Sequence, residues 1–590
     1  MNRDRRTTLA VGVVTFLALV VRLVELGARV AHQDEARVAY WAYRYMENGV
    51  YWYRPVVHGP FITIVDSWVF SLIGASDFSM RLVVALVGGL LPLAALLFRR
   101  RLRDSETVAL SVVLAAAPLF VYYSRFYRND LLLAGFMLVA FGCFVRAIDD
   151  RRPALVYLGV AFFALAFTTK ENAVIYAVTW VGATALLVDR RLLIHRVRES
   201  DIGPTIADLR RRVRYGVREW WPHAVFLFVE FLAIVVFFYA PRGEAAGAQP
   251  TIGDTLADPT LLAGLVREAT LGSWTAFVGH WGAGNSGSYL SAAGALWPAL
   301  QTGALFVLVF AVVGFLLDRY TGERPRDVVA FTFYWGFASA LGYPIAVANP
   351  FPWEVIHVAV PLVVPAAVGV AAVGRVALQG LRDAGGLDAL REGSPTLNRD
   401  ALAGLLAGLV LVMVAAHTGL AVYDTSFEND QNPDNALVQY AQSSSEMKPL
   451  LGELQEVIRT NDGTDVLYYG DNPDFDGDEL AGNESADDSP PADLNWFRRL
   501  PLSWYFEADG AVSNSTDDAA AFDRLVRGED RPPIVVAFGE TDSCGESYAS
   551  VADIESSLSG YERHEVQRFS YDSGCTISTM EIYVDENAVN

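Results

Sequence analysis

The sequence is poor in the residues that build metal and redox sites. Its 590 residues contain three cysteines, Cys143, Cys544 and Cys575, and their spacing matches no structural zinc site, which needs close pairs of ligands. Cys143 lies in an apolar run and is expected to be buried. Cys544 and Cys575 are expected outside the cell, where a disulfide is chemically permitted, and the sequence leaves open whether they pair.

Lysine is almost missing, and the acidic residues are unevenly distributed. Lys170 and Lys448 are the only lysines among 46 basic residues. The segment after Asp424 carries 35 acidic against 9 basic residues, about −26, whereas the rest of the chain is near +5. This acidity argues against a nucleic-acid partner, and together with the rarity of lysine it resembles proteins of salt-loving archaea.

Long apolar runs fill the chain between residues 7 and 423. Runs of about 17 to 22 apolar residues are long enough to cross a bilayer core as helices. They predict a polytopic α-helical membrane protein with eleven spans, near 8–28, 79–98, 107–123, 131–148, 154–169, 172–188, 222–240, 298–317, 327–348, 355–374 and 401–422. The first run is long, contains Arg22 and Glu25, and is expected to stay as an anchor rather than be cleaved.

Arginines set the expected orientation. With the N-terminus inside, 25 of the 46 basic residues fall in cytoplasmic segments, as the positive-inside rule requires. The chain is therefore expected to be a multi-pass protein of the cell membrane with a cytoplasmic N-terminus and an extracellular C-terminal domain.

Two domains are expected. Residues 1–424 form the transmembrane domain; its exterior loop 29–78 contains two interfacial helices, at 35–48 and 61–72, and its exterior loop 241–297 reads as a mobile cover. Residues 425–590 form an acidic exterior α/β domain. Its helices are predicted at 437–458, 519–526 and 551–558, its strands at 466–469, 534–538 and 580–584, and an acidic loop at 471–493.

Four polar clusters interrupt the apolar pattern, all on the predicted exterior side. Charged residues at a membrane boundary are costly unless solvated or paired, and convergent ones often line a substrate path. The clusters are Asp34 and Glu35; Arg125, Arg128 and Asp130; Lys170 and Glu171; and the stretch from Asn349 to His357.

A carboxylate beside cations suits transfer from a phosphate-linked donor, because the carboxylate takes a proton while arginine and lysine stabilise the departing phosphate. Structural roles compete with this interpretation. Asp34 is a good N-cap for a helix starting at Glu35. Lys170 and Glu171 can pair with each other at the boundary, and Arg125 and Arg128 can reach lipid phosphates. His58 and His357 are also explained as structural residues, and Trp353 as an interfacial anchor.

The motifs resemble those of GT-C glycosyltransferases of the protein mannosyltransferase and aminoarabinose transferase type, in which an acidic pair follows the first span. More narrowly, they resemble an archaeal family associated with flippase activity in protein N-glycosylation. The strings are His32-Gln-Asp-Glu-Ala, His58-Gly-Pro-Phe, Ser124-Arg-Phe-Tyr-Arg-Asn-Asp, Thr169-Lys-Glu-Asn and Asn349-Pro-Phe-Pro-Trp-Glu-Val-Ile-His357.

The resemblance implies a GT-C-like bundle that transfers a sugar, with inversion, from a polyprenyl or dolichyl phosphate carrier to an exterior acceptor. Asp34 would be the catalytic base with Glu35 assisting, and Arg125, Arg128 and Lys170 would bind the lipid phosphate. The expected substrate contacts are His58, Glu171, Trp353 and His357. No metal ligand is assigned; relatives differ in their need for a divalent metal, which stays an open alternative.

Two other functions compete with transfer. The same cluster of charges would serve a non-enzymatic, flippase-associated protein that handles lipid-linked saccharides across the membrane. A surface-domain anchor would explain the acidic tail but leaves the exterior charges without a role. A Trp-Trp-Asp-Tyr-Gly motif like that of oligosaccharyltransferase catalytic subunits is absent, which argues against en bloc glycan transfer.

Overall fold

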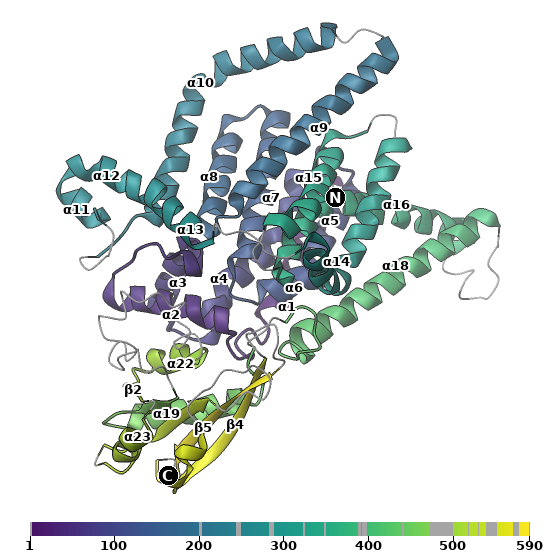
Figure 1. The fold of residues 1–590 in the computed structure, drawn as a ribbon. Coiled ribbons are helices and arrows are strands. Elements are labelled where there is room, and N and C mark those ends of the chain that lie inside the picture. Colours follow the sequence, from purple (N-terminus) through teal and green to yellow (C-terminus); the bar gives the residue numbers. More distant parts are fainter. Residues whose placement is uncertain are drawn as a thin grey trace.

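The structure is a computed structural model of the chain. It describes residues 3–588 except for 200–202, 244–248, 282–287, 322–324, 347–349, 387–390, 392–397, 439–441, 471–498, 517, 529, 539–550 and 570–576. A helical bundle makes up most of the molecule, and a small sheet domain lies at one end of it (Figure 1). The predicted fold class, a polytopic helical bundle followed by a small C-terminal α/β domain, is confirmed.

Within the described residues, nine helices are long and apolar enough to cross a membrane. They are α1 (Arg3–Leu23), α4 (Asp77–Leu90) with its 3₁₀ extension η2 (Leu91–Leu97), α7 (Asn129–Asp150), α9 (Ala173–Glu199), α10 (Gly203–Tyr239), α14 (Tyr289–Tyr320), α15 (Asp327–Ala346), α16 (Val355–Asp383) and α18 (Arg399–Tyr423).

The two other predicted spans differ from simple long helices. The span expected at 107–123 is a pair, α5 (Asp104–Ala116) and α6 (Pro118–Ser124), that meets at an angle of 52°. Pro118 explains the break. In a continuous helix its ring would clash with the carbonyl group one turn earlier, and it has no backbone N–H to donate. The span expected at 154–169 is α8 (Pro153–Thr169), an apolar helix of 17 residues.

Helix α16 forms the centre of the bundle. Within its apolar stretch of 18 residues, 89% of the residues are buried. Glycines let its neighbours approach closely: a Cβ on Gly314 of α14 would lie 1.9 Å from the carbonyl oxygen of Pro365, and Gly380 and Gly404 bring α16 and α18 together in the same way. Small residues at helix contacts are a common way to pack helices in lipid, where burial of apolar surface gives little driving force.

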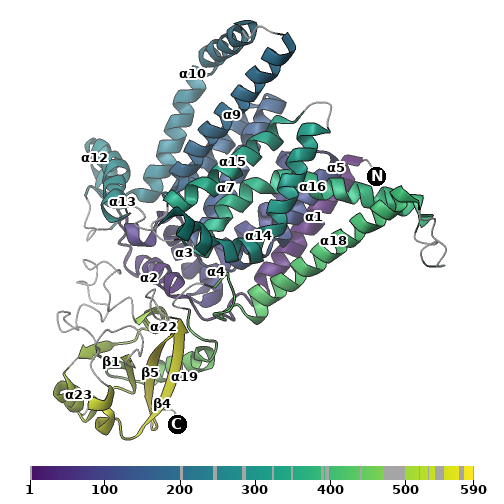
Figure 2. The ribbon, with the colours of Figure 1, turned by 45° about the vertical axis from the view of Figure 1, so that its right-hand side comes forward.

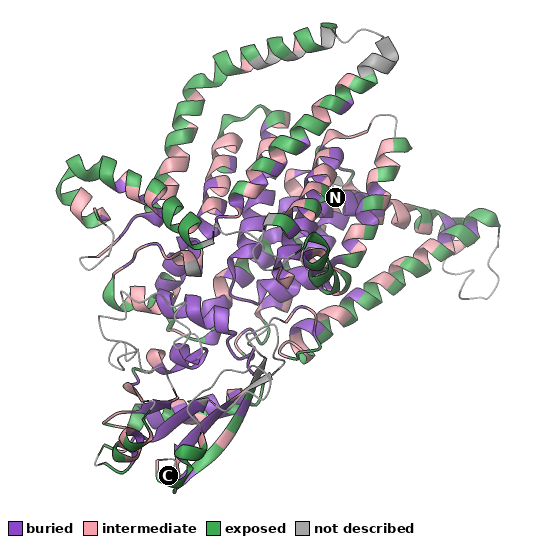
Figure 3. Ribbon diagram, in the orientation of Figure 1, coloured by how far each residue is buried: buried purple, intermediate pink, exposed green. Residues whose placement is uncertain are grey.

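Helices α10 and α18 are apolar but exposed. In each helix, only 6% of the residues in the apolar stretch of 18 residues are buried. Both helices run along the outside of the bundle (Figures 2 and 3). Apolar helices with such exposed surfaces need hydrocarbon around them, which agrees with a membrane location.

The first loop contains two helices, which pack on the end of the bundle. Helix α2 (Gln33–Asn48) ends at Gly49, whose φ of 70° is the left-handed conformation that favours glycine. A 3₁₀ turn, η1 (Pro55–Val57), leads to α3 (Pro60–Ile73), which begins with proline at its first position.

The second loop contains more regular structure than the mobile cover predicted for residues 241–297. It forms α11 (Ile252–Ala257), η3 (Pro259–Leu261), α12 (Leu262–Arg267), the π-helical turn η4 (Glu268–Gly272) and α13 (Ser273–Trp281). Leu265 and Ala269 pack with Tyr53 and Tyr239 in a small apolar cluster. The sequence did not predict this cluster, because its members come from three separate segments and the loop itself is rich in glycine and alanine.

The C-terminal domain contains a five-stranded mixed sheet in the order β2-β1-β3-β5-β4. Strand β1 (Val466–Tyr469) pairs in parallel with β2 (Ser513–Thr516) and β3 (Ile534–Phe538), whereas β5 (Ile577–Asp585) is antiparallel to β3 and β4 (Tyr561–Phe569). Its helices are α19 (Met447–Thr460), α22 (Leu502–Ala508) and α23 (Ala519–Val526).

Both faces of this sheet are covered. Val466 and Tyr468 belong to the large core that includes α19 and α22, while Leu467 and Tyr469 pack with Phe522 of α23. Side chains alternate between the faces of a strand, so a continuous apolar run such as Val466–Tyr469 is typical of a strand buried on both sides.

Some predictions for this domain are wrong or lie outside the described residues. The helix expected at 551–558 is two 3₁₀ turns, η8 (Val551–Asp553) and η9 (Glu555–Ser557). Strands β2 and β4 were not predicted because their sequences are mostly polar. Cys544, Cys575 and the loop 471–493 lie outside the described residues; Cys143 is buried.

Candidate active site

The acidic pair lies in the first turn of α2, and a neighbouring histidine caps the helix. His32 Nδ1 accepts a hydrogen bond from the backbone N–H of Asp34 at 3.0 Å, and Glu35 Oε2 accepts one from the backbone N–H of His32 at 2.9 Å. This reciprocal capping box leaves no N-cap role for Asp34. The interpretation of Asp34 as the helix cap is therefore wrong, and the cap is His32.

Glu35 is a fully occupied structural carboxylate. It is completely buried, accepts hydrogen bonds from Arg29 at 2.8 Å and from two nitrogens of Arg81 at 2.9 and 2.8 Å, and also accepts from the backbone N–H of Tyr127 at 2.7 Å. Burial alone would raise the pKa of Glu35, but Arg29 and Arg81 lower it to about 2. Glu35 therefore stays ionised and holds the loop before α2 against α4.

Asp34 faces a different set of cations. Its Oδ1 accepts a hydrogen bond from Arg37 Nη2 at 2.8 Å, and its Oδ2 is ion-paired with Arg128. The guanidinium carbon of Arg128 lies 3.4 Å from the centre of the Trp353 ring, a cation–π stacking contact. Arg128, far from Asp34 in sequence, thus holds it directly, and Trp353 fixes the plane of Arg128.

A second carboxylate cluster continues from Arg128. Asp130 Oδ2 lies 3.3 Å from Arg128 Nε, and Asp130 Oδ1 accepts a hydrogen bond from Lys170 Nζ at 2.7 Å. Lys170 Nζ also lies 3.4 Å from Glu354 Oε1. Glu354 belongs to the turn η5 (Pro352–Glu354), and Lys170 follows the last residue of α8. All of these side chains are buried.

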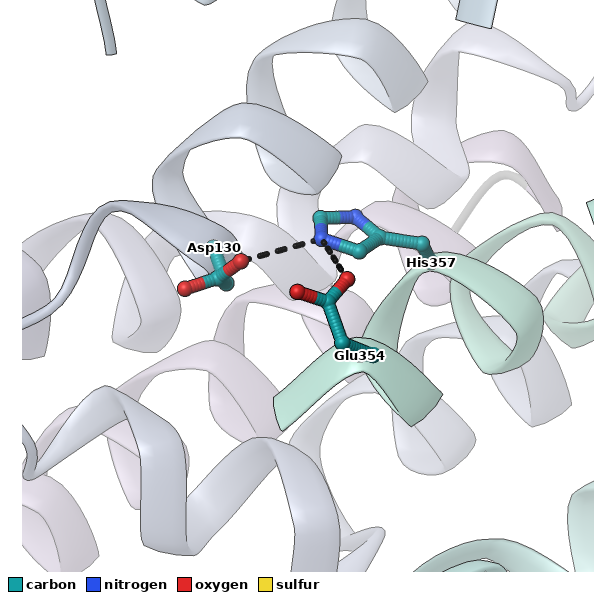
Figure 4. Close-up of side chains that lie close together, drawn as sticks. All are labelled: Asp130, Glu354 and His357. Carbon is teal, nitrogen blue, oxygen red and sulfur yellow. Dashed lines mark hydrogen bonds and ion pairs between the residues drawn. The ribbon is translucent and has the colours of Figure 1, made fainter. Parts of the chain in front are cut away.

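His357 closes this cluster. His357 Nε2 lies 3.1 Å from Asp130 Oδ1 and 3.6 Å from Glu354 Oε2, and the three side chains point toward one another (Figure 4). Its other ring nitrogen, Nδ1, lies 2.6 Å from the hydroxyl of Tyr176, and its ring stacks on Tyr343. His357 therefore orients Asp130.

The three residues Asp130, Glu354 and His357 have the geometry to bind a metal ion. One ligand atom from each lies within 4.8 Å of the others. Lys170 Nζ, however, already contacts both carboxylates, and its charge would oppose a cation at this position. With the ammonium group in place, the donor set is better explained as the counter-charge of Lys170 than as a metal centre.

His58 and Glu171 form a separate pair near Lys170. His58 Nδ1 lies 3.4 Å from Glu171 Oε2, and Tyr53 donates a hydrogen bond to Glu171 Oε1 at 2.5 Å. Burial lowers the pKa of His58, against the opposing effect of Glu171. Gly59 makes this approach possible, because a Cβ there would lie 2.4 Å from the carbonyl oxygen of Thr168 at the end of α8.

Arg125 does not join the cluster. Its two terminal nitrogens donate to the carbonyl oxygens of Val21, Arg22, Val24 and Glu25, where α1 ends, at 2.5 to 3.2 Å. Its guanidinium also lies over the ring of Phe427. These contacts place Arg125 with the end of α1 rather than with Arg128 and Lys170, so Arg125 is not available to bind a phosphate beside them.

Sequence reasoning missed the residues that complete the network. Asp130 and Glu354 lie inside the motifs, whereas Arg29 and Arg81 lie outside them. A charged residue within an apolar run, such as Arg81 in α4, is a signal that could have found one of them, because burial in a membrane helix requires a partner. Asn349, the first residue of its motif, lies outside the described residues.

The comparisons with known proteins agree with the motif resemblance. Residues 447–585 match the family described as "Agl23 flippase-associated protein C-terminal domain", and residues 57–199 match the family described as "Dolichyl-phosphate-mannose-protein mannosyltransferase". No curated protein sequence matches the chain significantly.

Solved structures extend the agreement to the fold. ArnT from Cupriavidus metallidurans, without ligand, has a TM-score of 0.53 and 16% identity, with 97% of each chain covered. ArnT bound to undecaprenyl phosphate gives the same TM-score and identity, with 98% of each chain covered. The oligosaccharyltransferase of Archaeoglobus fulgidus in the apo form has a TM-score of 0.47 at 13% identity, covering 94% of this chain and 73% of that one, too low to add to the assignment. The chain described here therefore has the GT-C fold of membrane glycosyltransferases.

Proposed function

We propose that the protein transfers a sugar from a polyprenyl or dolichyl phosphate carrier to an acceptor hydroxyl or amide, with Asp34 as the general base. The observation that carries this proposal is the continuous arrangement of Asp34, Arg128, Asp130 and Lys170. It pairs the carboxylate of Asp34 with Arg128, and Asp130 links Arg128 to a second cation, Lys170, from a distant part of the chain.

The proposed reaction is a single displacement at the anomeric carbon. The acceptor heteroatom forms a bond to this carbon as the bond to the phosphate oxygen of the carrier breaks, so the configuration inverts. Asp34 takes the proton of the acceptor. The carrier leaves as a phosphate monoester with one additional negative charge, which Arg128 and Lys170 stabilise.

The existing contacts of Arg128 give Asp34 a way to become a base. Before the donor binds, Arg128 is paired with Asp34. A phosphate group that binds Arg128 competes for the same guanidinium and leaves Asp34 with less cationic stabilisation, which makes the carboxylate a better proton acceptor. Donor binding would thus activate the base.

The remaining predicted site residues divide into two groups. Trp353 contacts Arg128, and His357 contacts Asp130, so we assign both a positioning role. His58 and Glu171 lie at the end of α8 beside Lys170 and keep their proposed role as substrate contacts. Glu35 is assigned to holding the loop before α2 rather than to assisting the proton transfer.

The comparisons support a lipid-phosphate donor without naming the sugar. The match to a dolichyl-phosphate-mannose-dependent family covers α3 to α9, which include Arg128, Asp130 and Lys170. ArnT, which has the same fold, is described as bound to undecaprenyl phosphate. We place the site on the exterior face and the N-terminus in the cytoplasm, because the arginines gather at the opposite end of the bundle. Residues 425–590 would then help to present the acceptor.

Asp34→Asn tests the assigned base. The full-length variant, reconstituted in liposomes with a radiolabelled polyprenyl-phosphate sugar, is expected to bind the donor but to lose transfer by about 10²- to 10⁴-fold. Glu47→Gln, an exposed carboxylate on the same helix, is the matched control and should retain transfer. Wild-type transfer by Asp34→Asn would contradict the assignment.

The match of residues 447–585 to a flippase-associated domain favours one alternative, a non-enzymatic protein that handles lipid-linked saccharides across the membrane. The same liposomes distinguish the two functions. Under the alternative, wild-type protein changes the sidedness of the labelled lipid, measured by its accessibility to a membrane-impermeant reagent, while no covalent product forms with any acceptor.

A further inference from the structure

A basic cavity lies at the end of the bundle away from the acidic pair. It has a volume of about 680 Å³. Helix α4 and its extension η2 separate the two ends, since Asp77 at the start of α4 contacts the C-terminal domain and the arginines after Leu97 line the cavity. Helices α5 and α16 meet near the N-terminus at this end (Figure 2).

Positive charge and apolar side chains line the cavity together. Three separate segments contribute its five arginines, which are Arg100, Arg101, Arg103, Arg326 and Arg375. The walls also contain Leu102, Leu317, Val368 and Ala372, and the two carboxylates Glu106 and Asp318. Guanidinium groups next to an apolar wall suit an amphiphile whose head is a phosphate, because the planar fork of arginine matches two phosphate oxygens.

Carboxylates neutralise some of these arginines more completely than others. Arg326 donates to Glu106 at 2.6 Å and to Asp318 at 2.5 Å, while Arg375 lies 3.7 Å from the same Glu106. Among the residues that the structure describes, no carboxylate forms an ion pair with Arg103, whose side chain is exposed. Arg103 and Arg375 thus keep most of their capacity to bind an anion.

Arg103 and Arg375 also line a second cavity of about 630 Å³ next to the first. Arg6, Thr7, Ser105 and the carboxylate Asp104 complete its polar lining. The two least neutralised arginines therefore stand between two adjoining cavities, where a bound group would reach both of them.

The positive-inside rule alone does not explain why these arginines converge on one cavity. The positive-inside rule requires arginines near the membrane surface, but it does not require them to converge on one partly apolar cavity from the segment before α5, the segment before α15 and α16. Convergence of like charges costs free energy unless an anion compensates for it. Basic pockets between membrane helices are known as sites for anionic headgroups.

We propose that this cavity binds the phosphate group of an anionic membrane lipid in the leaflet opposite the candidate active site. The lipid headgroup would contact Arg103 and Arg375, and its apolar part would continue along Leu317 and Val368. A soluble phosphate compound offers the same chemistry, so the test separates the two sources.

Native mass spectrometry of the full chain, released from nanodiscs of equal parts phosphatidylcholine and phosphatidylglycerol, measures the retained lipid. Wild-type protein is expected to retain phosphatidylglycerol selectively. The double variant Arg103→Gln with Arg375→Gln should lower this selectivity by about tenfold, as the loss of charge-assisted contacts predicts. The matched control, Arg211→Gln with Arg214→Gln, changes two exposed arginines of α10 at the same end and should keep it.

Pyrophosphate provides the second arm, measured as a shift of the thermal unfolding midpoint in nanodiscs of phosphatidylcholine alone. No shift, together with selective lipid retention that only the first double variant loses, supports the proposal. A pyrophosphate shift without selective lipid retention would assign the cavity to a soluble phosphate and overturn the lipid. Equal loss in both double variants, or no selectivity in the wild type, would reduce the cavity to general surface charge and overturn the proposal as well.

Discussion

At the residue scale, Asp34 and Glu35 show how neighbours of the same chemistry acquire different roles. Successive residues of a helix point about 100° apart, so Glu35 meets Arg29 and Arg81 while Asp34 meets Arg37 and Arg128. Both carboxylate oxygens of Glu35 already accept hydrogen bonds from these and neighbouring groups. Asp34 shares Arg128 with the rest of the cluster, and that shared partner is what makes Asp34 the better candidate for a base.

Arg128→Lys tests the phosphate contact. Lysine keeps the charge but loses the two-pronged donor and the stacking on Trp353, so we expect the KM for the lipid-phosphate donor to rise by about tenfold. Arg54→Lys is the matched control, because Arg54 also stacks on tryptophan rings, those of Trp41 and Trp52. An unchanged KM for Arg128→Lys would remove this arginine from the donor site.

Lys170 leads to a prediction about metals. Because its ammonium group lies between Asp130 and Glu354, transfer is expected to persist in the presence of EDTA. Replacing it by methionine removes the cation, so Lys170→Met should bind Zn²⁺ at Asp130, Glu354 and His357, measured by elemental analysis after desalting. Metal-dependent transfer by the wild type would contradict this account.

Glu507 gives the molecule a pH-dependent stability. Burial raises the pKa of this carboxyl from 4.5 to about 7, against the opposing effect of Arg44. The folded protein therefore holds a proton between about pH 4.5 and 7 that the unfolded chain has released, so this contribution to stability is present at low pH and is lost as pH rises through 7. Its size is at most about 3 kcal/mol.

The change Glu507→Gln replaces the titrating carboxyl by an amide, which does not titrate. Thermal unfolding midpoints should therefore fall less for the variant than for the wild type between pH 5 and 8. Glu456→Gln, on the exposed side of α19, is the control and should follow the wild type. Parallel curves for wild type and Glu507→Gln would show that the carboxyl keeps its ordinary pKa in the folded protein.

At the scale of elements, close backbone approaches decide where the motifs meet. The His58-Gly59-Pro60 turn packs against the end of α8 without space for a side chain at Gly59. This contact places His58 beside Glu171 and Lys170. The sequence correctly predicted the helices on both sides, but not this approach, because a glycine in a turn is equally consistent with an exposed loop.

Gly59→Ala is expected to push α8 away from this turn. Its Cβ would meet backbone atoms of Thr168 and Thr169, which cannot rotate aside, so we expect a loss of stability of about 1–3 kcal/mol and a loss of transfer as Lys170 moves. Gly12→Ala in α1 meets no atom within 4 Å and serves as the control. Differential scanning fluorimetry and the transfer assay measure the two effects; normal values for both would show that the turn can relax.

At the scale of the whole molecule, the C-terminal domain supports the loop that leads to Asp34. Tyr505 accepts a hydrogen bond from the backbone N–H of Ala31 at 2.7 Å and donates to Asp77 at 2.8 Å, and Gln442 accepts from Arg29 at 2.9 Å. Lys448 is ion-paired with Asp77 as well. The acidic domain is therefore joined to the candidate site and does not merely follow the last membrane helix.

The change Tyr505→Phe should weaken this connection. It leaves the buried N–H of Ala31 without its acceptor, at a cost of about 1–3 kcal/mol, and the loosened loop should lower transfer. Tyr561→Phe, which removes a hydrogen bond to Pro532 inside the same domain, should destabilise the domain without affecting transfer. Equal effects of the two variants on transfer would mean that domain stability alone matters.

The sequence by itself determined the membrane helices, the separate acidic domain and the motifs that contain the site. These features depend on hydrophobicity and charge along short stretches of sequence, because those local properties decide whether a segment lies in the bilayer or in water. Only the tertiary structure decided that Arg128 reaches Asp34, that Arg125 turns to the end of α1 and that Lys170 fills the carboxylate cluster. Each of these choices is a contact between distant segments, and packing of the whole bundle selects one partner among several charged residues that the sequence makes equally available.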